Sequence, residues 1–297
     1  MTPTLGALPA RFRRPRLLIV GCGDVGQRVA MGLSSRLKVL ALTSSPERVP
    51  ALRGQHITPL VGNLDDARSI ARLAGLATHV LHLAPPPSVG WSDPRTQALT
   101  RTLRLRSAPN HLVYGSTSGV YGDLKGGPAR ETLPTAAHTP RAFRRVSAER
   151  TVRDIVHSSI LRIPGIYAPD RDGGTPKERL LKGTPVLQKQ DDVYTNHIHA
   201  DDLARACIAA LWRGRPQRVY NSNDNTELRM GDYFDLAADL YGLPRPPRVR
   251  RDAAQEQMSL MLLSFMGESR RMDNTRLLHE LRVRLAYPTV ETGLLLK

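Results

Sequence analysis

The sequence predicts an α/β fold of the Rossmann type, a doubly wound parallel sheet with a smaller C-terminal substrate lobe. In the first half of the chain, short apolar segments alternate with helical ones, a rhythm typical of right-handed βαβ units. The first apolar segment runs into the glycine turn Gly21-x-Gly23-x-x-Gly26. Beyond residue 165 the rhythm gives way to a stretch rich in Gly, Pro, Lys and Asp at 167–194, which indicates a second lobe.

The elements of the first half are short apolar strands, each followed by a helical segment. The strands are expected at 17–20, 39–42, 57–61, 79–83, 111–114 and 160–163. The helices are expected at 24–33, from 46 onward, and at 65–74, 93–105 and 141–156. Parallel strands joined by helices place their carboxyl ends at one edge, which is where open α/β sheets bind ligands.

The second half is less regular. We expect a short amphipathic segment at 177–182, helices at 201–212, 231–241, 255–266 and 273–282, a strand at 218–221 and a Pro/Arg linker at 243–251. The domain plan is a flexible basic tail (1–15), a dinucleotide-binding core (16–165, with 198–225 returning to it) and a smaller substrate-binding lobe (166–197 and 226–297). The Met-rich segment 255–266 is either a core or interface helix or a flexible apolar wall of the substrate pocket.

The charge balance is strongly basic. Lys and Arg number 43 against 27 Asp and Glu, a formal net charge of +16, with arginine clusters at 11–16, 141–145 and 245–251. Such arginines either cover solvated faces or attract anions, whether nucleic acid or a small molecule. Aromatic residues make up only 5% of the chain and no nucleic-acid-reading motif accompanies the charge, so we do not expect nucleic-acid binding. We predict an anionic small-molecule substrate.

The apolar segment before Cys22 also suggests an exported lipoprotein, but it is too short. Only 17–20 are continuously apolar, whereas a secretory signal needs about 7–15 apolar residues and a membrane span about 20. Cys22 and Cys207 provide neither a disulfide framework nor a metal quartet. We therefore expect a cytoplasmic protein without membrane contact, and the sequence leaves the oligomeric state open.

One His/Asp pattern suggests a metal site. His197, His199 and Asp201 have a histidine–carboxylate spacing, and alternate strand residues share a face, so two ligands could converge. The other interpretation is a strand ending at Asp201, with Asp201 as N-cap of the next helix. We favour the second interpretation and predict no metal.

The glycine turn is suited to a dinucleotide because it follows a strand and opens a helix. The first glycine permits the tight turn, the second lets the backbone approach a pyrophosphate, and the third lets helix and strand pack closely. The helix N-terminus offers free N–H groups to the phosphates. The candidate cofactor-binding residues here are Gly21, Gly23, Asp24, Val25 and Gly26.

The segment after the second strand bears on the choice between NAD and NADP. An NAD-specific site places Asp or Glu about 20 residues after the glycine turn to hold the ribose 2′-hydroxyl. Here the chain reads Thr43-Ser44-Ser45, with no acid before Glu47, and Arg48 follows one turn later. The serines can donate hydrogen bonds and nothing repels a 2′-phosphate. We predict NADP as the cofactor, with NAD as the alternative.

Further motifs are GNLDD at 62–66, HLAPPP at 82–87, STSGVYG at 116–122, LRIPGIYAP at 161–169, IHADDLARA at 198–206 and a closing segment at 274–294. With the glycine turn, they resemble the extended and atypical short-chain dehydrogenase/reductases, in the NAD-dependent epimerase/dehydratase family that acts on nucleoside-diphosphate sugars. The resemblance places Thr117 at the family's catalytic Ser/Thr position. It implies further cofactor contacts at Asn63, Leu64, Leu83, Ala84, Pro85 and Pro164.

One departure from the family pattern concerns its active helix, which carries Tyr-x-x-x-Lys. The corresponding helix, PRAFRRVSAER at 140–150, has Arg141 and Arg145 at those two positions. Arginine can hold ribose hydroxyls, but its pKa above about 12 excludes it as an acid or base at neutral pH. The fold therefore transfers from the family, whereas the standard proton transfer does not.

The resemblance leaves two functions open. As an oxidoreductase or epimerase, the protein would move hydride between nicotinamide C4 and a carbon bearing oxygen. Thr117 would polarise that oxygen, and Tyr121 or Tyr167 would be the candidate proton donor. The alternative is a non-catalytic protein that senses NADP(H) and changes a partner contact.

Overall fold

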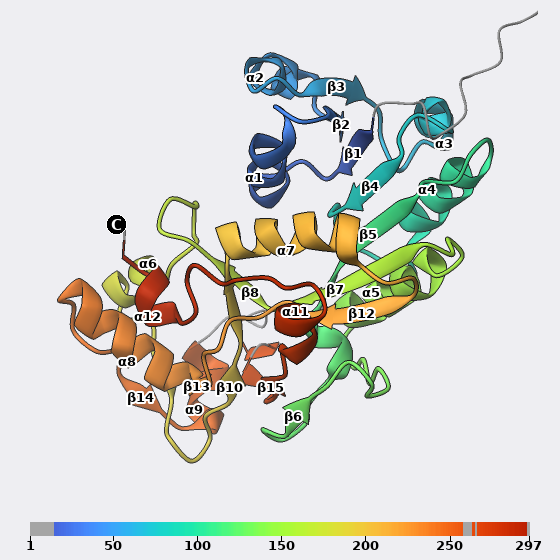
Figure 1. Cartoon of the computed structure of the whole chain (residues 1–297). Coiled ribbons are helices and arrows are strands. Elements are labelled where there is room, and N and C mark those ends of the chain that lie inside the picture. Colours follow the sequence, from blue (N-terminus) through green and yellow to red (C-terminus); the bar gives the residue numbers. More distant parts are fainter. Residues whose placement is uncertain (1–14, 258–262, 265, 296–297) are drawn as a thin grey trace, which may run out of the picture.

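The computed structural model describes residues 15–257, 263–264 and 266–295. At its centre is a seven-stranded parallel sheet with the order β12-β7-β5-β4-β1-β2-β3 (Figure 1). Its strands are β1 (Arg16–Val20), β2 (Lys38–Thr43), β3 (Thr58–Val61), β4 (His79–His82), β5 (His111–Thr117), β7 (Ser158–Ile163) and β12 (Arg218–Asn221). The predicted fold class is confirmed.

Helices cover both faces of this sheet. On one face are α1 (Asp24–Leu33), α2 (Val49–Gly54), α7 (Ala200–Arg213) and α11 (Thr275–His279). On the other face are α3 (Ala67–Ile70), α4 (Pro94–Arg104) and α5 (Pro140–Val152). The 3-10 turns η2 (Pro46–Arg48), η3 (Ala71–Leu73) and η4 (Ser118–Tyr121) follow β2, α3 and β5. The longer helices α1, α4, α5 and α7 bury one face against the sheet, as the 3.6-residue period predicts.

A second hydrophobic core lies at the end of the molecule away from β1–β3 (Figure 1). The helices that build or border it are α6 (Lys177–Leu181), α8 (Met230–Tyr241), α9 (Arg251–Gln257) and α12 (Val290–Gly293). Four strand pairs accompany them: β9 (Val186–Leu187) with β14 (Arg248–Val249), β10 (Tyr194–Thr195) with β13 (Leu228–Arg229), β6 (Pro128–Ala129) with β15 (Arg271–Met272), and β8 (Gly165–Tyr167) with β11 (His197–His199).

The chain reverses its direction across the sheet at β1. β2 and β3 lie on one side of β1, and β4, β5, β7 and β12 lie on the other. The carboxyl ends of β1 and β4 therefore flank a topological switch point, the usual ligand crevice of such sheets. The carbonyl of Val20 accepts hydrogen bonds from the N–H groups of Leu83 (2.7 Å) and Ala84 (3.0 Å), which ties the ends of the two strands together.

Several element boundaries differ from the prediction. β5 continues three residues further, to Thr117, because residues 115–117 keep their pairing with β7. The predicted helix 65–74 is divided into α3 and η3. The predicted helix 273–282 is only the short α11, and Arg282 beyond it adopts φ 55°, a left-handed conformation that no α-helix continues.

Two sequence predictions fall wholly or partly outside the described residues. The expected basic tail covers 1–15, of which residues 1–14 are not described. The expected Met-rich helix 255–266 includes 258–262 and 265, which are not described either.

Candidate functional site

Three adjoining hollows follow the carboxyl edge of the sheet. The first, of about 380 Å³, lies over the ends of β1–β3, and the second, of about 300 Å³, lies at the N-terminus of α1. These two share Gly21, Gly23 and Leu83 and are called the groove. The third, of about 680 Å³, is called the cavity. The groove and the cavity meet at a boundary formed by Thr117, Arg145, Pro164, Ile166 and Arg171.

The glycine turn forms the floor of the groove. Gly21 has φ 90°, and a Cβ there would lie 2.3 Å from the amide nitrogen of Ala84, so only glycine fits. At Gly23 a Cβ would meet no described atom within 4 Å, so the backbone there is open to the groove. Gly23 is also the N-cap of α1, without a side-chain hydrogen bond, which leaves the first-turn N–H groups directed at the second hollow.

Every candidate cofactor-binding residue lines a hollow. The residues at the second hollow are Gly21, Gly23, Asp24, Val25, Gly26, Leu83 and Pro164. The first hollow adds Thr43, Ser44, Ser45, Arg48, Asn63, Leu64, Ala84 and Pro85. The sequence motifs thus identify a continuous surface, although they come from five separate strand ends.

Arg48 crosses the first hollow. Its Nη2 donates to the carbonyl of Cys22 at 2.6 Å, which brings a guanidinium from the turn after β2 to the glycine turn. Burial raises the pKa of the Cys22 thiol to about 11, so the thiol stays protonated. Sequence reasoning missed Arg95, which also lines this hollow and binds both carboxylate oxygens of Asp65 at 2.7 and 2.6 Å; no motif marks that arginine.

At the boundary, Thr117 and Arg145 lie together. Thr117 ends β5, and its Oγ1 accepts a hydrogen bond from the N–H of Gly119 at 3.4 Å, so its hydroxyl proton can be directed into the cavity. Arg145 on α5 donates through Nη1 to the Gly115 carbonyl (2.9 Å) and the Tyr114 hydroxyl (3.1 Å). Arg141, one turn earlier on α5, lines the cavity.

The two candidate tyrosines are placed differently. Tyr121 is 1% exposed, lies in a small core with Val146 and Met272, and is absent from the described lining of all three hollows. Its hydroxyl donates to Asn221 at 2.7 Å. Tyr167 lines the cavity, and its hydroxyl donates to the Thr289 carbonyl at 3.2 Å. Burial raises the pKa of both phenols, so both stay protonated at neutral pH.

A buried ion pair between β7 and α5 lies next to the end of β5. Arg162 on β7 binds Glu149 on α5 through Nε (3.1 Å) and Nη2 (2.9 Å), and both side chains are 4% exposed. Ser116 donates to the same carboxylate at 2.6 Å. The Arg162 guanidinium also lies over the Tyr121 ring, 4.6 Å from its centre. This pair fixes α5 against the strand that ends in Thr117.

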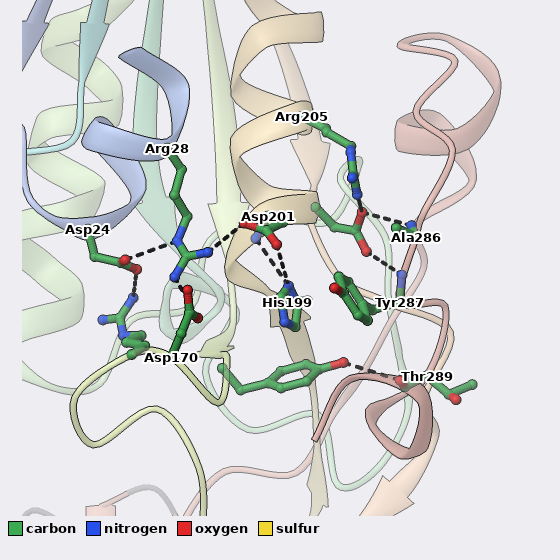
Figure 2. A network of polar contacts seen from close by, with 12 residues as sticks. Asp24, Arg28, Asp170, His199, Asp201, Arg205, Ala286, Tyr287 and Thr289 are labelled. Carbon is green, nitrogen blue, oxygen red and sulfur yellow. Dashed lines mark hydrogen bonds and ion pairs between the residues drawn. The ribbon is translucent and has the colours of Figure 1, made fainter. Parts of the chain in front are cut away.

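A second network links α1 to α7 and to the loop after β8 (Figure 2). Arg28 binds Asp24 (3.0 Å), Asp170 (2.8 Å) and Asp201 (2.5 Å). The prediction that Asp201 is the N-cap of the following helix is wrong: β11 ends at His199, whose Nδ1 accepts the Asp201 N–H at 3.2 Å. Because the N-cap is His199, two residues before the predicted one, the Asp201 carboxylate is directed to Arg28 instead.

The two histidines of β11 pack against aromatic rings. His197 packs against Tyr233 with ring centres 4.2 Å apart and the ring planes tilted by 30°, and His199 stacks on Tyr287 at 3.7 Å. Burial lowers the pKa of His197 to about 4 and also lowers the pKa of His199. His197 lines the cavity, which the sequence did not indicate.

The cavity is lined by arginines that sequence reasoning named only in part. Besides Arg141 and Arg145, they are Arg144, Arg171, Arg179 and Arg270, and the acid among the described lining residues is Glu268. By contrast, three arginines of the predicted cluster at 245–251 are paired with acids: Arg245 with Asp239 at 2.7 Å, Arg248 with Asp235 at 2.5 Å and Arg250 with Asp252 at 3.2 Å. In the described part of the chain, no helix is long and apolar enough to cross a membrane.

Known proteins share this sequence pattern and this fold. The model of the NAD dependent epimerase/dehydratase family matches residues 17–222. A functionally unknown conserved protein from Silicibacter pomeroyi DSS is 30% identical, with a TM-score of 0.80 over 94% of this chain and 96% of that chain.

Two relatives carry functional names. UDP-glucose 4-epimerase 4 from Oryza sativa subsp. japonica is 26% identical over 70% of this chain and 70% of its own. The structure of UDP-glucuronic acid 4-epimerase from Bacillus cereus in complex with NAD is 18% identical and has a TM-score of 0.73, covering 94% of this chain and 96% of that chain. At that identity the likeness concerns the fold.

Proposed function

The chain belongs to the NAD dependent epimerase/dehydratase family, as its motifs predicted, and from this premise we propose that it binds a nicotinamide dinucleotide in the groove and an anionic, nucleotide-sugar-like substrate in the cavity. The observation that carries the proposal is the continuity of the two sites at Thr117, Arg145 and Pro164. The names of the rice and Bacillus cereus relatives support both halves of it.

The groove fits a dinucleotide on its own geometry. The open position at Gly23 and the first-turn N–H groups of α1 suit a pyrophosphate. The Asp24 carboxylate beside them would repel phosphate, but Arg28 (3.0 Å) and Arg171 (3.1 Å) each bind one of its oxygens. Both cations therefore reduce the repulsion between the Asp24 carboxylate and a bound phosphate.

We infer a preference for NADP(H) over NAD(H). Thr43, Ser44 and Ser45 line the first hollow without an acid among them, and Arg48 spans it. A guanidinium beside a ribose 2′-phosphate forms charge-assisted hydrogen bonds that the 2′-hydroxyl of NAD cannot match. The preference follows from the same residues that the sequence singled out.

The chemistry proposed is hydride transfer at a carbon that bears oxygen. A bound nicotinamide dinucleotide supplies or accepts the hydride at C4. The Thr117 hydroxyl is positioned at the boundary to polarise the substrate oxygen, and the neighbouring cation Arg145 favours negative charge on it. Arg141 and Arg145 cannot supply a proton at neutral pH, so turnover of simple nucleotide sugars is expected to be low.

Calorimetric titration at matched salt tests the proposal. We expect both dinucleotides to bind and NADP+ to bind more tightly. Gly21→Val should abolish binding, because its Cβ would collide with Ala84; Gly242→Ala, far from the groove and also at positive φ, is the matched control for backbone strain. Absence of dinucleotide binding to the wild type would refute the proposed function.

A second candidate is a non-catalytic sensor of NADP(H). It is favoured by the positions of Tyr121 and Tyr167. Neither tyrosine lies on α5, and their hydroxyls donate to Asn221 and Thr289. Dinucleotide binding without turnover across a panel of nucleotide sugars would favour the sensor. Turnover that Thr117→Ala reduces, with NADP+ affinity unchanged, would favour the enzyme.

A further inference from the structure

The amino edge of the central sheet, opposite the groove, is strongly basic. The connections that lead there into β2, β3, β4, β5, β7 and β12 are residues 34–37, 55–57, 74–78, 105–110, 153–157 and 214–217. Asp154 is the one acid in these six connections. With the adjoining ends of helices and strands they present eight exposed cations: Arg16, Arg36, Lys38, Arg104, Arg106, Arg153, Arg213 and Arg215.

These eight cations are not explained by contacts within the fold. None of them forms an ion pair in the described part of the chain. Arg104, Arg153 and Arg213 lie at helix C-termini, where a cation is favoured by the helix dipole. Arg16 and Lys38, however, are partners in the register of β1 and β2, and like charges side by side repel each other. The edge therefore carries a positive charge that the fold does not need.

Exposed apolar side chains lie among the same cations. Leu105, between two of the arginines, is 71% exposed, Val156 is 68% exposed and Trp212 is 45% exposed. The Trp212 ring stacks on His79 with ring centres 5.2 Å apart, which places it over the start of β4, the central strand of the seven. Cationic and apolar side chains thus alternate along one end of the molecule.

The apolar side chains distinguish between the polyanions that could neutralise this edge. The phosphates of a nucleic acid would contact the cations but provide no apolar layer for Leu105 and Val156. An anionic bilayer provides phosphates for the cations, an acyl boundary for aliphatic side chains and an interface that tryptophan favours. From β2 to β12 the edge spans five strand spacings, about 24 Å, so many lipid headgroups can contact it at once.

We propose that the amino edge docks on an anionic lipid bilayer, with its cations on the lipid phosphates and Leu105, Val156 and Trp212 in the interfacial layer. The groove lies at the opposite edge of the sheet, so it stays accessible from water. The expectation of no membrane contact rested on the missing apolar span, which docking at a surface does not require. The proposal is independent of the proposed function.

Sedimentation of the full chain with vesicles tests the docking. We expect at least about tenfold tighter binding to vesicles with about one third phosphatidylglycerol than to pure phosphatidylcholine. About 0.5 M salt should remove most of that difference, because exposed charges are screened. The triple variant Arg36→Glu, Arg106→Glu and Arg215→Glu, which changes cations outside the helices, should weaken binding to the anionic vesicles by at least about tenfold.

A second triple variant is the matched control for net charge. Arg68→Glu, Lys177→Glu and Lys189→Glu make the same change of charge at exposed positions away from the amino edge, and none of the three forms an ion pair in the described part of the chain. This control should weaken binding to the anionic vesicles by no more than about twofold, because long-range attraction is screened. The melting temperatures of both triple variants show whether they fold.

Tryptophan emission reports the contact itself. Trp91 and Trp212 are the two tryptophans of the chain, so Trp91→Phe leaves Trp212 as the emitting residue, and Trp212→Phe leaves Trp91. Indole emission moves to shorter wavelength in apolar surroundings. We expect this shift with anionic vesicles in Trp91→Phe and not in Trp212→Phe, because Trp91 follows β4 at the carboxyl edge. This readout decides the proposal even if the first triple variant fails to fold.

Each outcome decides for or against the proposal. Equal binding to both kinds of vesicle, or an equal loss in the two triple variants, overturns it. Absence of the Trp212 shift also overturns it, and tight binding of duplex DNA in that case would identify a nucleic acid as the partner. A failure of NADP+ binding would refute the proposed function and leave the docking proposal intact, and a failure of vesicle binding would do the reverse.

Discussion

The arginines around α1 and β5 differ from those of the cavity in the groups that they bind. Around α1 and under β5, Arg28 binds three carboxylates and Arg162 binds Glu149 through two hydrogen bonds. In the cavity, Arg179 has no carboxylate partner in the described part of the chain, and Arg145 has only neutral acceptors. Removing a paired arginine leaves its acid without a counter-charge, whereas an unneutralised arginine in a cavity costs free energy until an anion binds. Partner type, rather than residue type, separates the structural arginines from the candidate ligand-binding ones.

The strongest test of the paired side is Arg162→Met. Removing one partner of a buried pair leaves the Glu149 carboxylate without compensation, so we expect a loss of about 3–5 kcal/mol in the free energy of unfolding. Chemical denaturation measures it. The double variant with Glu149→Met removes the stranded charge and should recover part of the loss. A loss below about 1 kcal/mol in the single variant would contradict the structural role.

Arg28→Met sharpens the comparison at a more exposed site. The Arg28 side chain is 12% exposed, but its carboxylate partners are 33–57% exposed, so solvent screens them. We expect a loss of about 2 kcal/mol, made of charge-assisted hydrogen bonds and new repulsion among three acids. The loss should shrink in about 1 M salt. A salt-independent loss would show that packing, not charge, accounts for it.

The sequence predicts the groove better than the cavity, for a physical reason. Groove residues follow strand ends in short consecutive motifs such as Gly21–Gly26 and Thr43–Ser45, and parallel strands bring those ends to one edge. Cavity residues come from α5, the loop after β8, α6 and the segment 268–270, and no local period relates Arg179 or Arg270 to Thr117.

Side-chain direction is the other feature that the sequence could not supply. Tyr121 lies four residues after Thr117, yet its hydroxyl points into a core towards Asn221. Asp201 is of a residue type favoured at N-caps, but β11 pairs with β8 as far as His199, which makes His199 the N-cap of α7. The Asp201 carboxylate binds Arg28 instead. Both outcomes depend on contacts between segments far apart in the chain.

A pH titration probes the cavity wall. His197 has a pKa of about 4 in the folded protein because of burial, against about 6.5 when unfolded. Between these values only the unfolded chain binds the proton, so stability is full above about pH 6.5 and falls as the pH drops towards 4. We expect His197 to account for about 3 kcal/mol of that fall by pH 4, since one pKa unit corresponds to about 1.4 kcal/mol. Denaturation curves of His197→Phe should show a correspondingly flatter pH dependence; an unchanged slope would contradict this.

Arg48→Ala tests the cofactor preference. Losing the guanidinium at the first hollow should weaken NADP+ by about tenfold through lost charge-assisted hydrogen bonds, and NAD+ by no more than about twofold. Calorimetry with both dinucleotides measures the two affinities. Arg53→Ala, an exposed arginine on α2 outside the described lining of the groove, is the matched control. An equal loss of affinity for NADP+ and NAD+ would show that Arg48 does not contact the 2′-phosphate.

The free energy of unfolding of Arg179→Met, measured with NADP+ present and with or without saturating UDP-glucose, tests the central claim most directly. Without UDP-glucose, we predict a stability within about 0.5 kcal/mol of wild type or higher, because a desolvated charge is removed. The stabilisation by UDP-glucose should fall by about 1.4 kcal/mol, the equivalent of a tenfold weaker affinity. A variant that is destabilised by more than about 1 kcal/mol without UDP-glucose and keeps the full stabilisation with it would contradict the account.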